Sequence, residues 1–251
     1  MKAHERLFRL FHQSLLANEG FKRVRQTSLG EVKDSLVYVR FVVIRRDRLT
    51  TSDLVPGPTV KTIEPASLDK GEFGFSLEIG GWPRCLLTDE EVSRICRAPI
   101  GDGLAAWHAD AVWSADDDRG DCRSRIWVVG DSTDIDLMLN EVATVFQEQL
   151  WPAALEYSDS RSLMRFWMSL VRRTPDSVRI ISGYHGEPLL ACLLKLAQHH
   201  SDQRVIDELR RAGPVYLRDR ASQEREFVAH TKNIEWSLRV KDHGIWPDEP
   251  V

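Results

Sequence analysis

Leu36-Val-Tyr-Val-Arg-Phe-Val-Val-Ile44 is the stretch that decides the fold. β-Branched and aromatic residues fill it almost without interruption, which is typical of a strand inside a sheet. We therefore predict a central strand over these residues. A second strand is predicted at 73–79, where apolar residues alternate with small or polar ones, and Gly80-Gly81 is expected to end it.

Amphipathic helices are predicted on both sides of these strands from apolar residues at helical spacing. They cover residues 3–18, 88–97, 131–151, 159–172, 187–199, 202–212 and a longer segment from Gly213-Pro214 toward Lys241. Thr88-Asp-Glu-Glu91 has the capping-box arrangement, in which the Thr and Glu side chains satisfy free N–H groups of the first turn. Trp151-Pro152 is expected to end the helix that begins near Asp131.

These elements predict an α+β protein with an antiparallel sheet flanked by helices and a helical C-terminal lobe. A further strand is expected at 125–129, and short or doubtful ones at 59–63 and 178–182, within a chain whose residues 45–71 read as a long connection. The predicted division is an α+β domain over 1–155 and a helical lobe over 156–251.

Composition favours an ordinary globular protein, because 42% of the residues are hydrophobic and 29% are charged. The first residues lack the apolar run of a secretory signal, so we expect a cytoplasmic, soluble protein. The four cysteines are dispersed without a Cys-x-x-Cys pair, which is typical of reduced structural thiols. No cofactor is expected.

The charge is segregated along the chain. Residues 1–50 hold 11 basic and 5 acidic side chains, whereas residues 51–150 hold 8 basic and 19 acidic ones. Basic residues near the N-terminus, such as Lys22 and Arg23, could contact phosphates, but few aromatic residues are interleaved with them and the whole chain is acidic. We therefore do not expect nucleic acid or a membrane as the partner.

The strongest functional signal is the acidic segment, residues 110–136, which holds eight Asp and three Arg. Such a segment can attract a basic partner through charge complementarity, or it can simply be solvated. Our hypothesis is a non-enzymatic bacterial interaction protein, in its more specific form an immunity protein that binds and neutralises a basic toxin. The expected partner-binding residues are Asp110, Trp113, Asp116, Asp117, Asp118 and Asp121.

The alternative is a metal-dependent nucleotidyltransferase or nuclease-like enzyme that uses Asp134 and Asp136, because an Asp-x-Asp pair can hold magnesium. However, Asp residues in the first turn of a helix are also favoured by capping and by the helix dipole. His108 with Asp110 and the aspartates of 116–118 could likewise form a metal site or a solvated loop. No catalytic residue and no metal ligand is assigned.

Two other groups of polar residues read as structural. Cys192, His199 and His200 share one helical segment without the spacing of a zinc site, so we expect a packed cysteine and two surface histidines. The chain has no Gly-x-Ser-x-Gly elbow and no phosphate-binding glycine loop. Tryptophans such as Trp107, Trp113 and Trp127 are expected in the core or in a groove.

Several stretches resemble the bacterial domain-of-unknown-function 4304 family over about residues 5–170. They are the first helix followed by Gly20-Phe-Lys-Arg23, Phe73-Gly-Phe-Ser-Leu-Glu-Ile-Gly80, Ile100-Gly-Asp-Gly leading to Trp113, and the Trp127 strand with the helix to Trp151-Pro-Ala-Ala-Leu155. Residues 45–72 depart from the compact family pattern. The resemblance implies an antiparallel sheet, no established activity, and members that occur near toxin or defence genes; it carries over no catalytic residue.

Overall fold

A computed structural model describes residues 2–44, 72–97, 105–110, 127–172 and 186–221. Its strands are β1 Lys22–Val24, β2 Thr27–Val32, β3 Ser35–Ile44, β4 Phe73–Pro83, β5 Trp107–Asp110 and β6 Trp127–Val129. Its helices are α1 Ala3–Phe11, the π-helix η1 His12–Leu16, the 3₁₀ turn η3 Arg84–Leu86, α2 Asp89–Arg97, α3 Ile135–Val145, the π-helix η4 Phe146–Leu150, α4 Trp151–Tyr157, α5 Ser160–Arg172, α6 Gly186–His199 and α7 Gln203–Ala221.

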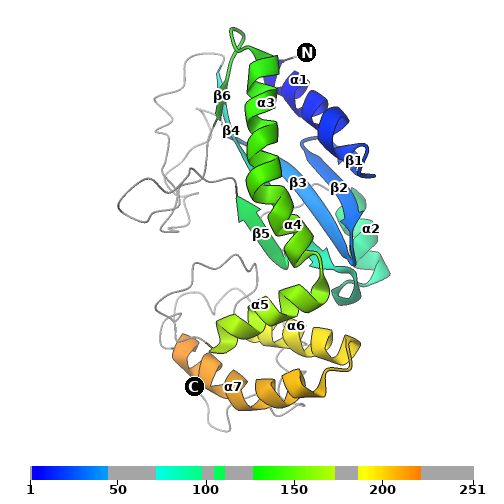
Figure 1. Ribbon diagram of the computed structural model, residues 1–251, viewed down its shortest axis with the longest axis vertical. Coiled ribbons are helices and arrows are strands. Elements are labelled where there is room, and N and C mark those ends of the chain that lie inside the picture. The colour runs from blue at the N-terminus through cyan, green and yellow to red at the C-terminus, as the bar shows by residue number, and fades with distance from the viewer. Residues whose placement is uncertain (1, 45–71, 98–104, 111–126, 173–185, 222–251) are drawn as a thin grey trace.

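The six strands form one antiparallel sheet in the order β1-β2-β3-β4-β5, and β6 also pairs with β4. Helices α1 and α3 lie side by side along the sheet, and α5, α6 and α7 form a helical region beyond its end (Figure 1). The predicted α+β class with C-terminal helices is therefore confirmed. Whether residues 156–251 are a separate domain stays a prediction.

β3 is the central strand that its apolar sequence predicts, because it pairs with β2 on one side and along its full length with β4 on the other. Its Phe41 side chain packs against α1. Phe8 stacks on Phe41 with ring centroids 4.0 Å apart, and Phe11 meets the same ring edge-on at 5.0 Å. Burial of each such ring contributes about 2–3 kcal/mol, so α1 is held mainly by aromatic packing.

The predicted end of the second strand at Gly80-Gly81 is wrong, since β4 continues through both glycines to Pro83. A Cβ atom at Gly80 would lie 2.6 Å from the carbonyl oxygen of Trp107 and 2.7 Å from the Tyr38 hydroxyl. Here glycine permits close approach of neighbouring chains in a sheet rather than a turn.

Two predicted helix ends are also wrong. Pro152 lies in the first turn of α4, where a missing N–H group is tolerated, so the chain stays helical from α3 through η4 into α4. Gly213-Pro214 lies inside α7, whose buried Leu209 and Tyr216 hold both halves of the helix against its neighbours. Packing thus outweighs the cost of an interior proline, about 3 kcal/mol.

The predicted helix start at Asp131 is wrong, since α3 begins at Ile135 with Asp134 as its N-cap. The part of the last predicted helix beyond residue 221, toward Lys241, lies outside the described residues. The prediction of α2 with its capping box is confirmed. The Thr88 backbone N–H donates to Glu91 Oε2 at 2.7 Å, and the Glu91 N–H donates to Thr88 Oγ1 at 3.2 Å. The strands β1, β2 and β5 were not predicted, because they are short or, like Thr27–Val32, mix polar residues and glycine with apolar ones. The strands expected at 59–63 and 178–182 lie outside the described residues.

The turn between β2 and β3, residues 33–35, joins the sheet to the helices. Lys33 adopts a left-handed backbone with φ 51°, and its ammonium donates to the Leu155 carbonyl oxygen in α4. The Ser35 hydroxyl donates to the Ser158 carbonyl oxygen at 2.9 Å. Both contacts join residues more than 120 positions apart in the chain. The 33–35 turn therefore sets where the helical region begins.

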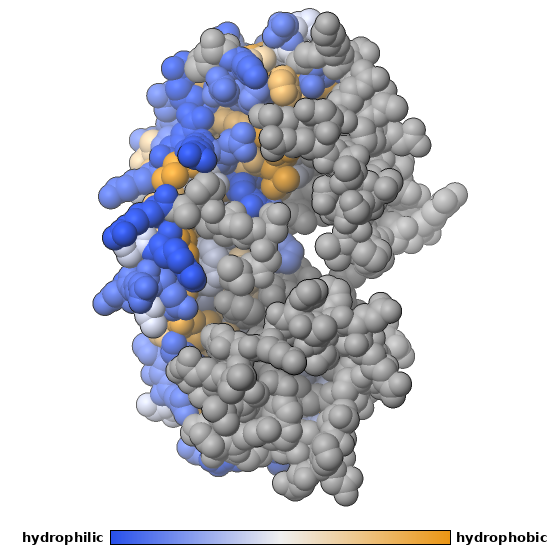
Figure 2. Space-filling view, turned by 180° about the vertical axis from the view of Figure 1, so that it is seen from behind, coloured by the Kyte–Doolittle hydropathy of each residue, from blue (hydrophilic) through white to orange (hydrophobic). Residues whose placement is uncertain are grey.

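The opposite view of the molecule shows where apolar side chains reach the surface. Hydrophilic residues dominate the described surface on this side, and hydrophobic ones gather in patches among them (Figure 2). No helix in the described ranges is both long enough and apolar enough to cross a membrane.

Candidate functional site

The edge of β4 carries two separate strands, β5 and β6. Asp110, the last residue of β5, lies opposite Glu78, and Trp127, the first residue of β6, lies opposite Phe75. Only Ser76 and Leu77 separate these positions on β4, whereas residues 111–126 connect the two strands along the chain. The middle of the acidic segment is therefore an insertion that leaves and rejoins the same edge of the sheet.

The predicted partner-binding residues fall largely in this insertion. Asp110 lies at the end of β5. The others, Trp113, Asp116, Asp117, Asp118 and Asp121, lie outside the described residues. Their role stays a prediction, and what the structure adds is the position of the two strands that flank them.

The described C-terminal end of the acidic segment is a group of exposed carboxylates at the start of α3. Asp131, Asp134 and Asp136 are all exposed. Directly after them comes Leu137, whose side chain is 68% exposed and is one of the large hydrophobic residues that the described surface leaves uncovered. Single exposed apolar residues are common on protein surfaces, so Leu137 alone marks no interface, although beside carboxylates such a side chain can serve as an apolar anchor.

Asp134 also has a structural role. It is the N-cap of α3, and its Oδ1 accepts hydrogen bonds from the backbone N–H groups of Asp136 at 3.0 Å and Leu137 at 3.1 Å. This is the capping interpretation of the Asp-x-Asp pair. Within the described ranges, no three or more His, Cys, Asp or Glu side chains are arranged to hold a metal ion.

His108, the other metal candidate, lies on β5 opposite Gly80 and is half-buried. Its proposed companions at 116–118 are outside the described residues. Two residues before Gly80 on β4, Glu78 forms an ion pair with Arg40 on β3, with 2.7 Å between Arg40 Nε and Glu78 Oε1. Because Glu78 is engaged by this arginine, it is a poor candidate for a free metal ligand.

Asp34, Ser160 and His200 form a cluster where the sheet meets the helical region, and sequence reasoning missed it. Asp34 accepts hydrogen bonds from the Ser160 backbone N–H, at 3.0 Å, and from the Ser160 hydroxyl. The Ser160 Oγ lies 2.8 Å from His200 Nε2. These are the three residue types of a hydrolase triad, so their hydrogen-bond directions matter.

The directions are those of a structural cluster. A serine hydroxyl has one proton, and an ionised carboxylate can only accept, so Ser160 donates to Asp34. His200 Nε2 must then carry a proton and donate to Ser160, which leaves it unable to act as the base for that hydroxyl. Ser160 is also 1% exposed. The cluster anchors the first turn of α5 and is not a nucleophile.

The surroundings of His200 lower its pKa. Burial is the main cause, and the neighbouring Arg161 and His199 act in the same direction against the opposing effect of Asp34 and Asp159. His199 is exposed, as expected, whereas His200, also expected at the surface, is half-buried and hydrogen-bonded to the Ser160 hydroxyl.

The cysteines of the described residues are free thiols. Cys192 is fully buried, as predicted, and burial raises its pKa far above the ordinary value. Burial and the nearby Asp34 also raise the pKa of the Cys85 thiol. Neither thiol is activated as a nucleophile, since that requires a lowered pKa.

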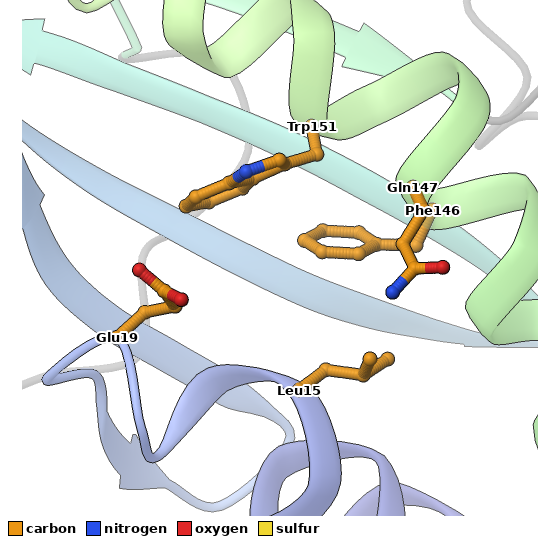
Figure 3. A pocket seen from close by; sticks show the side chains of 5 residues that line it. All are labelled: Leu15, Glu19, Phe146, Gln147 and Trp151. Atoms are coloured by element: carbon orange, nitrogen blue, oxygen red, sulfur yellow. The ribbon is translucent and has the colours of Figure 1, made fainter.

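A small groove lies where the two π-helical turns meet. Its lining comes from Leu15 and Glu19 on one side and from Phe146, Gln147 and Trp151 on the other (Figure 3). Its volume is about 100 Å³. Nothing in the sequence pattern marks it, because a π-turn has no compositional signal comparable to a cap or a heptad.

Comparisons of the chain with protein-family models, with curated proteins and with solved structures return no match.

Proposed function

We propose that this chain is a non-enzymatic bacterial interaction protein, an immunity protein that binds and neutralises a basic toxin through its acidic segment. The observation that carries the proposal is the exposed group at the start of α3. There Asp131, Asp134 and Asp136 are exposed beside Leu137, which is 68% exposed. Leu137 supplies an apolar anchor, and the carboxylates supply charge that steers a basic partner and orients it.

The split edge of the sheet gives further support. The segment between Asp110 and Trp127 is flanked by strands that pair with one rigid neighbour, β4. A binding segment whose two ends are fixed loses less conformational freedom on association than a free tail. The proposal places the protein in the cytoplasm, where an immunity protein must meet its toxin.

The test is capture of the partner by the tagged full-length protein from the source bacterium, followed by titration of the purified partner. We expect one stoichiometric basic protein whose toxicity is relieved by co-expression. The double variant Asp131→Lys with Asp136→Lys should weaken binding by about ten-fold or more, and Leu137→Ala by about five-fold.

Asp89→Lys with Glu90→Lys is the matched control, because both are exposed carboxylates in the first turn of α2 and the change in net charge is the same. It should leave the affinity unchanged. If both charge reversals weaken binding equally, the effect is one of net charge and the proposed surface is wrong. Failure of the captured protein to be toxic alone, or to be relieved of toxicity, would count against the immunity role.

A further inference from the structure

The groove between the two π-helical turns is built from an unusual pair of elements. In η1 the Ala17 N–H bonds the His12 carbonyl oxygen at 2.9 Å, and in η4 the Trp151 N–H bonds the Phe146 carbonyl oxygen. Each bond spans five residues, so each helix is locally wider than an α-helix. Such turns are rare and are found disproportionately at functional sites. Here both contribute residues to the lining of one groove.

The aromatic side of the groove is held rigidly. Trp151 contacts Phe146, at 5.7 Å between ring centroids with the planes 37° apart, and Phe21, at 6.2 Å with the planes 60° apart, so neither ring stacks flat on the indole. Phe21 is itself pinned against Gly30, where an added Cβ would come within 2.6 Å of the ring. Trp151 nevertheless remains partly exposed toward the groove. An indole face fixed in this way is prepared to stack on a flat group without further ordering.

The opposite side supplies a carboxylate. Glu19 is exposed, and Figure 3 shows it extending toward Trp151 across the groove, with Gln147 on the same side as Phe146. Among the described residues, no ion pair or side-chain hydrogen bond engages Glu19 or Gln147. Negative charge beside an indole ring is the combination that recognises a cation stacked on an aromatic face.

We infer that this groove binds an arginine side chain of a partner protein. A planar guanidinium can stack on Trp151 and direct two N–H groups at the Glu19 carboxylate, whereas an ammonium is compact and strongly hydrated. The volume of about 100 Å³ suits one side chain, because pockets for whole small molecules are about 300 Å³ or more. The lining has no cationic residue for the α-carboxylate of free arginine. The inference is independent of the acidic segment.

The test uses nuclear magnetic resonance of the full-length protein with Nα-acetyl-arginine amide as the probe. We expect saturable shifts of the Trp151 indole N–H and the Gln147 side-chain NH₂ signals, assigned with Trp151→Phe and Gln147→Leu variants. Nα-acetyl-citrulline amide, which is neutral but of the same shape, should bind at least about five-fold more weakly, as should the lysine analogue. Free arginine should also bind more weakly than the blocked probe.

Glu19→Gln should weaken binding of the arginine probe by about five-fold or more, while Glu148→Gln, an exposed carboxylate on η4 outside the groove lining, should leave it unchanged. Unchanged thermal unfolding will show that both variants fold.

Equal shifts with arginine and citrulline probes, equal affinity of Glu19→Gln and the unsubstituted protein for the arginine probe, or no shift at all would overturn the inference. Tighter binding of lysine or of free arginine would overturn the choice of occupant. Asp131→Lys should not alter the titration, which separates this site from the acidic surface.

Discussion

The sheet region and the helical region are stabilised by different kinds of core. Around the sheet the core contains a cluster of aromatic rings among aliphatic side chains, and its members come from distant parts of the chain, as where Phe75 meets Phe8, Phe41 and Trp127. In the helical region the core of α6 is aliphatic and is packed against the next helix along the chain. The first region therefore depends on long-range assembly, and the second on helix pairs that are local in sequence.

The largest expected effect comes from the aromatic core. Phe75→Ala removes a side chain that is 0% exposed and contacts three rings, and should lower the free energy of unfolding by about 3–5 kcal/mol. Leu193→Ala, equally buried in α6, should cost about 2–4 kcal/mol. Urea denaturation measures both changes.

Tryptophan fluorescence and far-ultraviolet circular dichroism test whether the sheet region and the helical region unfold together. If the two regions unfold as one unit, both signals will change at the same urea concentration in each variant. A transition that splits only in Leu193→Ala would show that the helical region unfolds by itself. A loss below about 1 kcal/mol for Phe75→Ala would contradict the account of the core.

The next effect concerns the junction between the regions. Asp34→Ala removes the acceptor of the Ser160 backbone N–H at the start of α5, and should cost about 1–2 kcal/mol, as loss of a helix cap does. Asp34→Asn keeps one acceptor oxygen and should cost less. Glu31→Ala, an exposed residue on the same hairpin, should be nearly neutral. If Asp34→Ala were as stable as the unsubstituted protein, this contact would not hold the regions together.

A smaller effect is expected from pH. The pKa of His200 is lowered in the folded protein, so the unfolded chain takes up a proton first as the pH falls below the ordinary value of about 6.5. Stability is therefore complete above that value, falls as the pH drops toward the lowered pKa, and levels off below it. Burial and Arg23 lower the pKa of His12 in the same direction. The decrease in melting temperature between pH 8 and pH 5 should be smaller in His200→Gln than in the unsubstituted protein. An equal decrease in both would contradict a contribution from His200.

The smallest effect lies on the surface of the helical region. Arg172 of α5 and Glu208 of α7 form an ion pair in which the arginine side chain is 55% exposed. Solvent screens such pairs, so Glu208→Gln should change stability by less than about 1 kcal/mol, and added salt should reduce the difference further. A larger loss in urea titrations would mean that this pair, rather than the aliphatic core, fixes α5 against α7.

The sequence predicted best what depends on local pattern. The apolar run of β3, the capping box of α2 and the Asp cap of α3 each have a signal within a few residues. It predicted worst what depends on contacts between distant segments. Gly80 was interpreted as a stop because its neighbour Trp107 is remote in sequence, and Pro214 as a break because packing of α7 could not be foreseen.

The candidate sites also differ in whether a local sequence pattern could reveal them. The carboxylates of Asp131, Asp134 and Asp136 belong to a visible charge run, so they could be found from sequence. The groove of Glu19 and Trp151 and the Asp34–Ser160 contact join residues more than 120 positions apart, and neither has a local motif.

The split edge strand has a consequence for how the gene can vary. β5 and β6 pair with β4 independently, and their registers are set by the residues opposite them rather than by the length of chain between them. Residues can therefore be added to or removed from 111–126 without shifting either strand. The sequence between the two strands can therefore diverge while the pairings of Asp110 and Trp127 with β4 are kept.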